Sequence, residues 1–483
     1  MPDWWRIWRQ FAPELILSEL VGANSVIDPV APPLMLRSVE LDGAIADVSI
    51  RQGKVNAIGS NLPAESGMTV IAGQGHALLP GLHDHHIHLN ATAAAMASVW
   101  CGPSGVRDAD ALIKALFAAP GSGWLRGIGY HDSVAGELDR SWLDQHGPDR
   151  PIRIQHRSGR MWIMNSRALA ELGIDGKSDG RLLDSDSWLR DRMPSALPDL
   201  SEVGAYLASK GITGLTETTP RNGLSDYRRL ASAGLAQRLL VMGTADLNGA
   251  PPMAMARIGA TKFHYHDHDL PTLEDLVRRV AESHDAGRPV ASHCTTPAEL
   301  MLTLLAMEEA GPMAGDRIEH GSVISPDNAE WIARLGLTVV SQPHFLTERG
   351  DAYLADVDEQ DRPWLYRLAG LKRQGIALAA GSDAPFGSAD PWQSMAAAVS
   401  RYPGFGEDEA LTPEEALALF TGPPEAPGAG PRKVAPGQAA DLCLLDRPWS
   451  AARADLASVG VRLTLVGGRQ AYASSGEIAQ HRS

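Results

Sequence analysis

The feature that most constrains the fold is an alternation of short apolar runs with amphipathic helical stretches, which begins at about residue 210. Short apolar runs that alternate with helices indicate βαβ units and a parallel sheet. The helix starts are well marked, because Thr296-Pro-Ala-Glu and Thr412-Pro-Glu-Glu each combine a capping residue, a proline at the first helical position and a capping-box glutamate. The strands are predicted at residues 214–217, 238–242, 261–264, 289–293, 317–320, 338–341 and 377–383.

An earlier strand that ends near His88 brings the number of βα units to eight. Eight such units predict an α/β fold with a closed (β/α)8 TIM-like barrel more readily than an open sheet. We place this barrel at residues 79–430. A stretch of weak periodicity at about residues 100–205 is too long for an ordinary loop, so we predict an insertion that lies over the carboxyl-terminal face of the barrel.

Both ends of the chain are rich in short β-like runs that are broken at glycines. These runs predict one small β-sandwich domain built from both termini, from residues 14–78 plus 431–478. The first 13 residues contain three tryptophans, at positions 4, 5 and 8, and we assign them no role.

The composition excludes several classes of protein. The net charge of −15 provides no basic surface for nucleic acid. No apolar stretch approaches the ~20 residues that span a bilayer. Three widely spaced cysteines and the absence of a signal peptide are typical of a reducing compartment, so we expect a cytoplasmic protein with a small-molecule substrate and neither a nucleic-acid nor a membrane partner.

The strongest local signal is the sequence Leu79-Pro-Gly-Leu-His-Asp-His-His-Ile-His88. Alternate residues of a strand face the same side, so His86 and His88 point together at the end of the first barrel strand. Two imidazoles placed in this way can bind one divalent metal ion. His83 and His85 have the opposite parity and are expected to turn away from it.

Further polar residues end other strands of the predicted barrel. His293 ends the fifth strand, His320 ends the sixth, and Asp383 ends the eighth. The carboxyl ends of barrel strands meet on one face, where active sites of this fold lie. The sequence therefore predicts a ring of metal-binding side chains on that face.

This composite pattern resembles the amidohydrolase superfamily, especially its metal-dependent branch, amidohydrolase family 3. The resemblance extends from the strand-rich start to Val434-Ala-Pro-Gly-Gln-Ala-Ala-Asp-Leu. It implies that His86 and His88 bind a buried metal and that His293 and His320 bind a more exposed one. It also implies that Asp383 is both a metal ligand and the proton shuttle, and it is compatible with a homo-oligomer.

The resemblance further implies a lysine on the fourth strand that is carboxylated on its amine and bridges two metals. Lys262 occupies the matching place, and the alternative is an ordinary lysine at a strand start. Glu217, at the end of the second strand, is a rival that could bridge instead or only accept hydrogen bonds. The histidines at 264, 266 and 268 depart from the expected pattern and are interpreted as pocket residues, alternative ligands or a solvated loop.

Several other side chains are candidates for substrate contact. His344 follows the seventh strand on the correct rim, although it could instead only hydrogen-bond its own loop. In the insertion, His156 could polarise a carbonyl and Arg160 could pair with a carboxylate, with Trp162 as part of the wall. Arg349 is a further wall candidate. The alternative for the insertion residues is hydrogen bonding within the insertion itself.

The predicted function is metal-dependent hydrolysis of an amide-like C–N bond of a small molecule. The expected cofactor is a divalent metal, as one or two ions. Zn²⁺ is the natural choice for nitrogen and oxygen ligands, and iron, manganese or cobalt are the alternatives. Metal-activated hydroxide would attack a polarised carbonyl, and Asp383 would transfer the proton to the departing nitrogen.

Three alternatives are compatible with the same barrel. A deaminase is the first, although deaminases of the superfamily typically carry a glutamate where this chain has Thr296. The second is an esterase or lactonase, because metal-activated water does not select the leaving group. The third is a non-catalytic binding relative, which predicts eroded ligands, whereas the expected ligands are present.

Overall fold

The computed structural model describes residues 31–103, 105–174, 178–183, 185, 188–189, 192, 198–474 and 481–482. The first 13 residues, and residues 14–30 of the predicted sandwich, lie outside this range. Within the described chain, one compact unit comprises residues 90–199, and the other comprises residues 31–89 together with the described residues from 200 onward. No helix among the described residues is long and apolar enough to cross a membrane.

An eight-stranded parallel sheet forms the barrel of the larger unit, which confirms the predicted α/β barrel. Backbone hydrogen bonds join the two strands at the ends of the sheet just beyond their carboxyl ends. The backbone N–H of His88 donates to the Ala384 carbonyl at 3.0 Å, and the backbone N–H of Asp383 donates to the His86 carbonyl at 2.7 Å. The strands are β6 (Leu82–Ile87), β12 (Ile212–Glu217), β13 (Arg238–Gly243), β14 (Ala256–Phe263), β15 (Val290–Cys294), β16 (Arg317–His320), β17 (Thr338–Ser341) and β18 (Ala377–Ala380).

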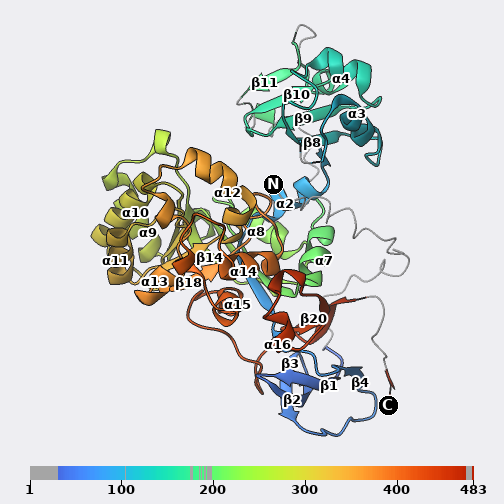
Figure 1. Cartoon of the computed structure of the whole chain (residues 1–483), viewed down its shortest axis with the longest axis vertical. Coiled ribbons are helices and arrows are strands. Elements are labelled where there is room, and N and C mark those ends of the chain that lie inside the picture. The colour runs from blue at the N-terminus through green and yellow to red at the C-terminus, as the bar shows by residue number, and fades with distance from the viewer. Residues whose placement is uncertain are drawn as a thin grey trace. The chain divides into compact units, whose positions relative to one another are not determined.

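Helices cover the outside of this barrel (Figure 1). The two predicted helix starts are confirmed, because Thr296 and Thr412 each form a capping box. Ser325 also caps the helix that begins at Pro326. The helices of this unit are α7 (Ser201–Ser209), α8 (Leu224–Ala231), α9 (Leu273–Asp285), α10 (Pro297–Ala310), α11 (Pro326–Leu335), α12 (His344–Asp356), α13 (Ala369–Arg373), α14 (Pro391–Val399), α15 (Pro413–Thr421) and α16 (Trp449–Ala452).

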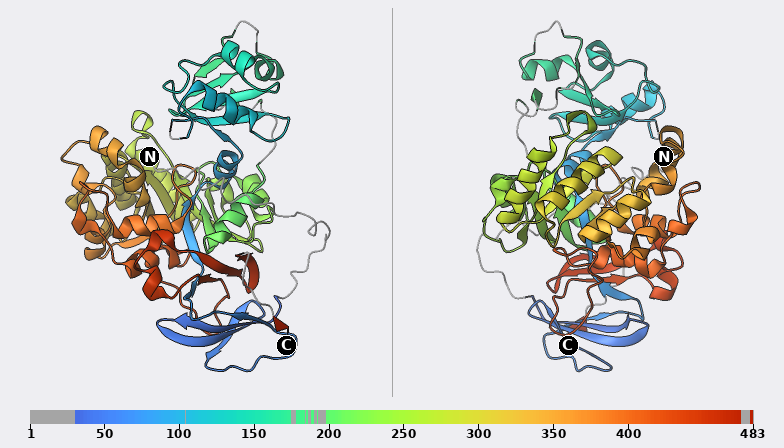
Figure 2. Two further views of the ribbon diagram at one scale, coloured as in Figure 1. Left: turned by 45° about the vertical axis from the view of Figure 1, so that its right-hand side comes forward. Right: turned by 90° about the vertical axis from the view of Figure 1, so that its left-hand side faces the viewer.

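Two further sheets of the same unit contain strands from both ends of the chain, as predicted (Figure 2). Their buried leucines, isoleucines and valines form one apolar core, to which Leu36, Ile50, Leu444 and Leu463 belong. One sheet contains β1 (Leu34–Leu41), β2 (Ala44–Arg51), β3 (Lys54–Gly59), β4 (Thr69–Ala72) and β22 (His481–Arg482), and the other contains β5 (Leu78–Pro80), β19 (Leu442–Leu445), β20 (Val461–Val466) and β21 (Arg469–Ala473).

The smaller unit has a five-stranded mixed sheet and its own apolar cores, where the sequence showed only weak periodicity. The strands are short, so few residues of each can express an alternating pattern. Its strands are β7 (Val99–Trp100), β8 (Leu125–Tyr130), β9 (Ile152–His156), β10 (Met161–Met164) and β11 (Arg181–Leu183), and its helices are α3 (Ala109–Phe117), α4 (Arg140–His146) and α5 (Ser166–Glu171), with α2 (Leu89–Met96) leading into the unit. The predicted domain boundaries and the predicted place of the insertion over the barrel stay predictions.

Candidate metal centre

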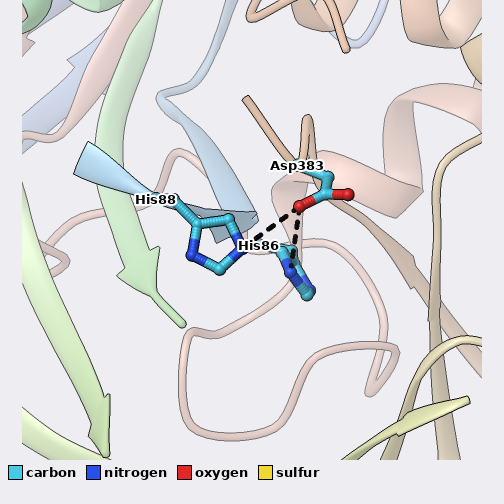
Figure 3. Close-up of side chains that lie close together, drawn as sticks. All are labelled: His86, His88 and Asp383. Atoms are coloured by element: carbon cyan, nitrogen blue, oxygen red, sulfur yellow. Dashed lines mark ion pairs between the residues drawn. The ribbon is translucent and has the colours of Figure 1, made fainter. Parts of the chain in front are cut away.

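Three side chains converge where β6 and β18 meet at the carboxyl end of the barrel (Figure 3). The Nε2 atoms of His86 and His88 lie 3.4 and 3.2 Å from the same carboxylate oxygen of Asp383. One ligand atom from each of the three residues lies within 4.8 Å of the other two. Two imidazole nitrogens and a carboxylate oxygen are suitable ligands for one divalent ion.

In three of the strand-end histidines, His86, His88 and His320, the protein holds the Nδ1 atom of the ring. His86 Nδ1 contacts the Glu319 carboxylate, and His88 Nδ1 lies 3.1 Å from the Thr219 hydroxyl. His320 Nδ1 lies 2.8 Å from the Gln342 side-chain oxygen. Metal-binding histidines are typically oriented through the nitrogen that does not bind the ion. These contacts leave Nε2 of the three rings for a ligand, whereas Nε2 of His293 lies 3.4 Å from the Thr295 hydroxyl.

Two residues of the site adopt the left-handed backbone region, which non-glycine residues seldom use. The φ angles are 69° at His320 and 50° at Asp383. Side chains of consecutive strand residues normally point to opposite faces. The left-handed backbone at His320 ends this alternation in β16, so the side chains of Glu319 and His320 both lie beside His86. Such strained backbone gathers at functional sites.

Glu319 belongs to the site although sequence reasoning assigned it no role. Its side chain is fully buried between His86 and the Arg317 guanidinium, whose Nε donates to it at 2.5 Å. Burial alone would raise its pKa, but the positive charges of Arg317 and Lys262 hold the pKa well below the usual value. Glu319 is therefore an anion that can orient His86. An acidic residue directly before a strand-end histidine was the available signal.

Lys262 lies near the carboxyl end of β14, in the interior of the barrel. It is 5% exposed, and its Nζ has no hydrogen-bond partner among the described residues. Burial, with a smaller contribution from Arg317, outweighs the carboxylates of Glu319 and Asp383 and lowers its pKa to about 8. A buried amine without a partner is costly, so another group is expected to occupy its surroundings.

His293 and His320 extend the group of imidazoles on the neighbouring strands. Their ring centroids lie 4.5 Å apart, and that of His320 lies 4.8 Å from the ring of His86. Burial lowers the pKa of His320 to about 3 and lowers that of His293 further. Both rings are therefore neutral at physiological pH, which is the form that binds metal ions.

Asp383 is held as an anion in this cluster. Burial would raise the pKa of its carboxyl group, but hydrogen bonds from His86 and His88 and the charge on His86 hold the pKa well below the usual value. Beneath it, one oxygen of Asp84 accepts from the backbone N–H groups of His86 at 3.0 Å and Ser382 at 2.9 Å. Asp84 thus connects the two chain segments that carry the cluster.

Glu217 lies near this group, but its oxygens bind the backbone. They accept from Leu89 N at 2.6 Å and Thr219 N at 2.9 Å, and from the Asn222 amide at 3.3 Å. This geometry matches the hydrogen-bonding alternative for Glu217. Its carboxylate fixes the loops that follow β6 and β12.

His344 is buried, and both of its ring nitrogens have protein partners. Nδ1 lies 3.1 Å from the Ser394 hydroxyl, and Nε2 lies 3.0 Å from the Ser382 carbonyl. The neighbouring Arg349 donates to the Phe386 carbonyl and lies over the Phe345 ring. The partners of His344 therefore lie on α14 and after β18 rather than in its own loop. Its contact with substrate stays a prediction.

The remaining candidates lie in the smaller unit. His156 Nδ1 is 2.9 Å from the Ser158 hydroxyl, and Arg160 is exposed on the same turn. Trp162 is buried in the apolar core of its own unit, beneath the guanidinium groups of Arg126 and Arg153. Trp162 is therefore a core residue of this unit, and the substrate roles of His156 and Arg160 stay predictions.

The remaining histidines of the motif turn away, as strand parity predicts. His83 is buried with Nε2 2.9 Å from the Thr216 hydroxyl, and its ring lies beside that of His85. One exposed aromatic residue was missed by sequence reasoning: Phe386 is 60% exposed and its ring is edge-on to His88, with 5.8 Å between centroids. Its position makes it a candidate for substrate contact.

Clustered imidazoles, buried carboxylates and a buried amine at the carboxyl end of an eight-stranded barrel are typical of the class of metal-dependent barrel hydrolases. Residues 69–472 match the amidohydrolase family, so the chain belongs to that family. Membership confirms the prediction of an amidohydrolase, an enzyme that acts on carbon–nitrogen bonds other than peptide bonds.

Curated relatives match over most of their length. An N-substituted formamide deformylase of Arthrobacter pascens is 25% identical over 91% of this chain and 97% of its own. The putative amidohydrolase YtcJ of Bacillus subtilis (strain 168) is 25% identical over 83% of this chain and 90% of its own. Among solved structures, an uncharacterized metal-dependent hydrolase of Pyrococcus furiosus has a TM-score of 0.72 and is 22% identical to this chain. The match covers 86% of this chain and 99% of the other, and it supports the barrel fold.

Proposed function

We propose that this chain hydrolyses an amide-like C–N bond of a small molecule at a divalent metal centre, with zinc as the expected ion. The convergence of His86, His88 and Asp383 carries the proposal, because the two Nε2 atoms face one oxygen of a buried carboxylate. These three residues would hold one ion, and His293 and His320 would hold a second. When bound, the metal lowers the pKa of water and polarises the substrate carbonyl.

The proposal assigns the proton transfer to Asp383. Its anionic carboxylate accepts the proton of the attacking water while a new C–O bond forms. It then donates this proton to the nitrogen as the C–N bond breaks, so the products are an acid and an amine. The backbone N–H of Asp383, which donates to the His86 carbonyl oxygen at 2.7 Å, would hold the residue in place for both transfers.

Lys262 is proposed to be carboxylated on Nζ. Its neutral amine would attack CO₂, forming an N–C bond and releasing one proton. The resulting carbamate supplies two anionic oxygens for metal binding, which an ammonium group cannot do. The proposal is supported by the buried, unpartnered Nζ and by a pKa of about 8, which leaves part of the amine neutral near neutral pH.

The deaminase alternative is disfavoured by the position of Thr296. The fifth strand is followed at this point by a helix cap, where the Thr296 hydroxyl accepts from Glu299 N at 3.2 Å and donates to Asp267 at 2.6 Å. The side chain is thus engaged in capping α10, and it is not an acid. The name of the Arthrobacter relative supports N-substituted formamides as the first compounds to test.

The wider biological setting is also a proposal. The net charge of −15 supports a small-molecule substrate and no nucleic-acid partner. All three cysteines are free and buried, which supports a reducing compartment such as the cytoplasm.

The test of the proposed reaction is Asp383→Asn, assayed on N-substituted formamides together with metal content. We expect kcat to fall on the order of 10²–10⁴-fold with metal retained, because general acid–base catalysis contributes about that much. Asp358→Asn, at an exposed position, is the matched control. Full activity of Asp383→Asn would contradict the assigned role.

A further inference from the structure

Three histidines follow β14 directly, and the proposed reaction uses none of them. His264, His266 and His268 alternate with Tyr265 and Asp267, and all three histidines are exposed. The segment ends in a short 3-10 helix, Asp267–Asp269. Three imidazoles therefore gather beside the candidate metal centre, where they could bind the same kind of ion.

The rings of this segment continue the row of imidazoles that begins inside the barrel. The centroid of His293 lies 4.5 Å from that of the buried His320 and 4.1 Å from that of His264. From His264 the row continues to His266 at 4.7 Å and to His268 at 5.4 Å. The planes of the last two rings are parallel within 4°. An unbroken series of imidazoles thus connects solvent to the proposed metal ligands.

Contacts on the two sides of the segment fix its position. Tyr265 and Phe263 stack with 6.2 Å between ring centroids, and the Arg279 guanidinium lies 5.4 and 5.0 Å from the same two rings. Asp267 accepts the hydrogen bond from Thr296, the cap of α10. Because the odd-numbered residues are engaged in these contacts, the even-numbered histidines are presented as a separate row.

The row is suited to transient rather than permanent binding of a cation. Imidazole is the commonest protein ligand for transition metals, and two rings on alternate residues can share one ion. A stable site needs three or more converging ligands. Among the described residues, the group of three His, Cys, Asp or Glu with closely converging ligand atoms is His86, His88 and Asp383, so the outer histidines lack a third ligand.

We propose that His264, His266 and His268 form an uptake path, which captures a divalent cation from solvent and passes it to His293. The exposed pair His266 and His268 binds the ion first, with Asp267 and Asp269 adding negative charge beside it. His264 then exchanges for one of these ligands and brings the ion to His293. This inference rests on the proposed metal centre, because that centre is the destination of the ion.

The test is the rate at which the full-length, chelator-stripped protein takes up Co²⁺, followed by stopped-flow visible absorption. We expect the double variant His266→Gln/His268→Gln to take up the ion several-fold more slowly, because the two ligands that capture it first are lost. The final number of ions per chain and the equilibrium affinity are expected to match the wild type, because all proposed resident ligands remain. His146→Gln, a histidine on α4, is the control.

An uptake rate of the double variant equal to that of the wild type would overturn the path. A loss of equilibrium affinity equal to the loss of rate would also overturn it, because the histidines would then be resident ligands. If the wild-type chain bound no Co²⁺ at all, the proposed metal centre would itself be wrong. The first two results would overturn only the uptake path and leave the proposed function intact. Failure of the path is therefore distinguishable from failure of the metal centre.

Discussion

At the residue scale, three imidazoles of the centre are held by a protein oxygen at Nδ1. Glu319 contacts His86, Thr219 contacts His88 and Gln342 contacts His320. An ionised partner makes the strongest of such hydrogen bonds. Glu319 is therefore the supporting residue whose loss should disturb the centre most.

Glu319→Gln is predicted to weaken metal binding on the order of 10–100-fold, because the amide cannot supply the negative charge that orients His86. The affinity is measured by competition with a chelator. Glu217→Gln is the matched control, since it also alters a fully buried carboxylate, but one that binds backbone N–H groups. Equal affinities of Glu319→Gln and the wild type would refute the supporting role, and weaker binding by Glu217→Gln would revive Glu217 as a ligand.

The sequence predicts those ligand positions that strand alternation and strand ends determine. His86 lies on β6 and His88 directly follows that strand. The other predicted ligands lie at or just after the carboxyl ends of their strands, so these positions could be predicted; they are His293, His320 and Asp383. Glu319 was missed although an acidic residue directly before a strand-end histidine was a visible signal, because strand alternation would turn its side chain away from that of His320, and only the left-handed backbone at His320 brings both to the centre. Nothing in the residue type of a histidine indicates that conformation.

At the element scale, a buried carboxylate caps the short helix α13. Glu409 accepts from the N–H groups of Leu368 at 2.9 Å and Gly370 at 2.7 Å, and from Arg367 Nε at 2.9 Å. Burial alone would raise its pKa, but the hydrogen bonds from Gly370 and Arg367 lower it below the usual value of 4.5. The charged form of Glu409 is therefore the one that stabilises the fold.

Glu409→Gln is predicted to lower the free energy of unfolding by about 2 kcal/mol at pH 7, the range for hydrogen bonds to a charged group. Because the folded pKa is depressed, this contribution is present above the unfolded pKa and is lost as the pH falls through the folded pKa. The difference from the wild type should thus shrink below about pH 4.5. Urea denaturation at several pH values measures the free energy of unfolding of both proteins, and Glu359→Gln, at an exposed position, is the control. A difference between Glu409→Gln and the wild type that does not change with pH would contradict the role of the charge.

At the scale of the whole chain, the sandwich is continuous with the strand that carries the metal ligands. β5 pairs with β19, and only Gly81 separates β5 from β6. Gly81 donates to the Asp441 carbonyl at 2.8 Å, and Asp441 also binds the Arg238 guanidinium at 2.8 Å. The two ends of the chain therefore fix the start of the first barrel strand.

Leu463→Ala, in the core of the sandwich, is predicted to destabilise the larger unit by about 2–5 kcal/mol, the range for buried leucines. Because the sandwich and the barrel share one compact unit, we expect them to unfold in one transition. Calorimetry measures the number of unfolding transitions and their temperatures. The control Ile45→Ala, at a 57% exposed position, should leave the stability nearly unchanged. A separate sandwich transition at lower temperature, with the barrel unchanged, would be inconsistent with this coupling.

The architecture was predictable because parallel strands and capped helices leave local signals, as the Thr296 and Thr412 capping boxes show. The sheet of the smaller unit was not, since β7 has two residues and β11 has three. Such short strands depend on contacts between distant segments, which a local pattern does not record.

The most direct test of the proposed centre is the number of divalent ions per chain, measured by elemental analysis of protein produced with zinc and bicarbonate. We predict one or two ions per chain in the wild type, as in mononuclear and two-metal hydrolases, and a loss of metal in His86→Asn/His88→Asn. A folded wild-type chain without bound metal, or a double variant that retains all of it, would contradict the proposed function.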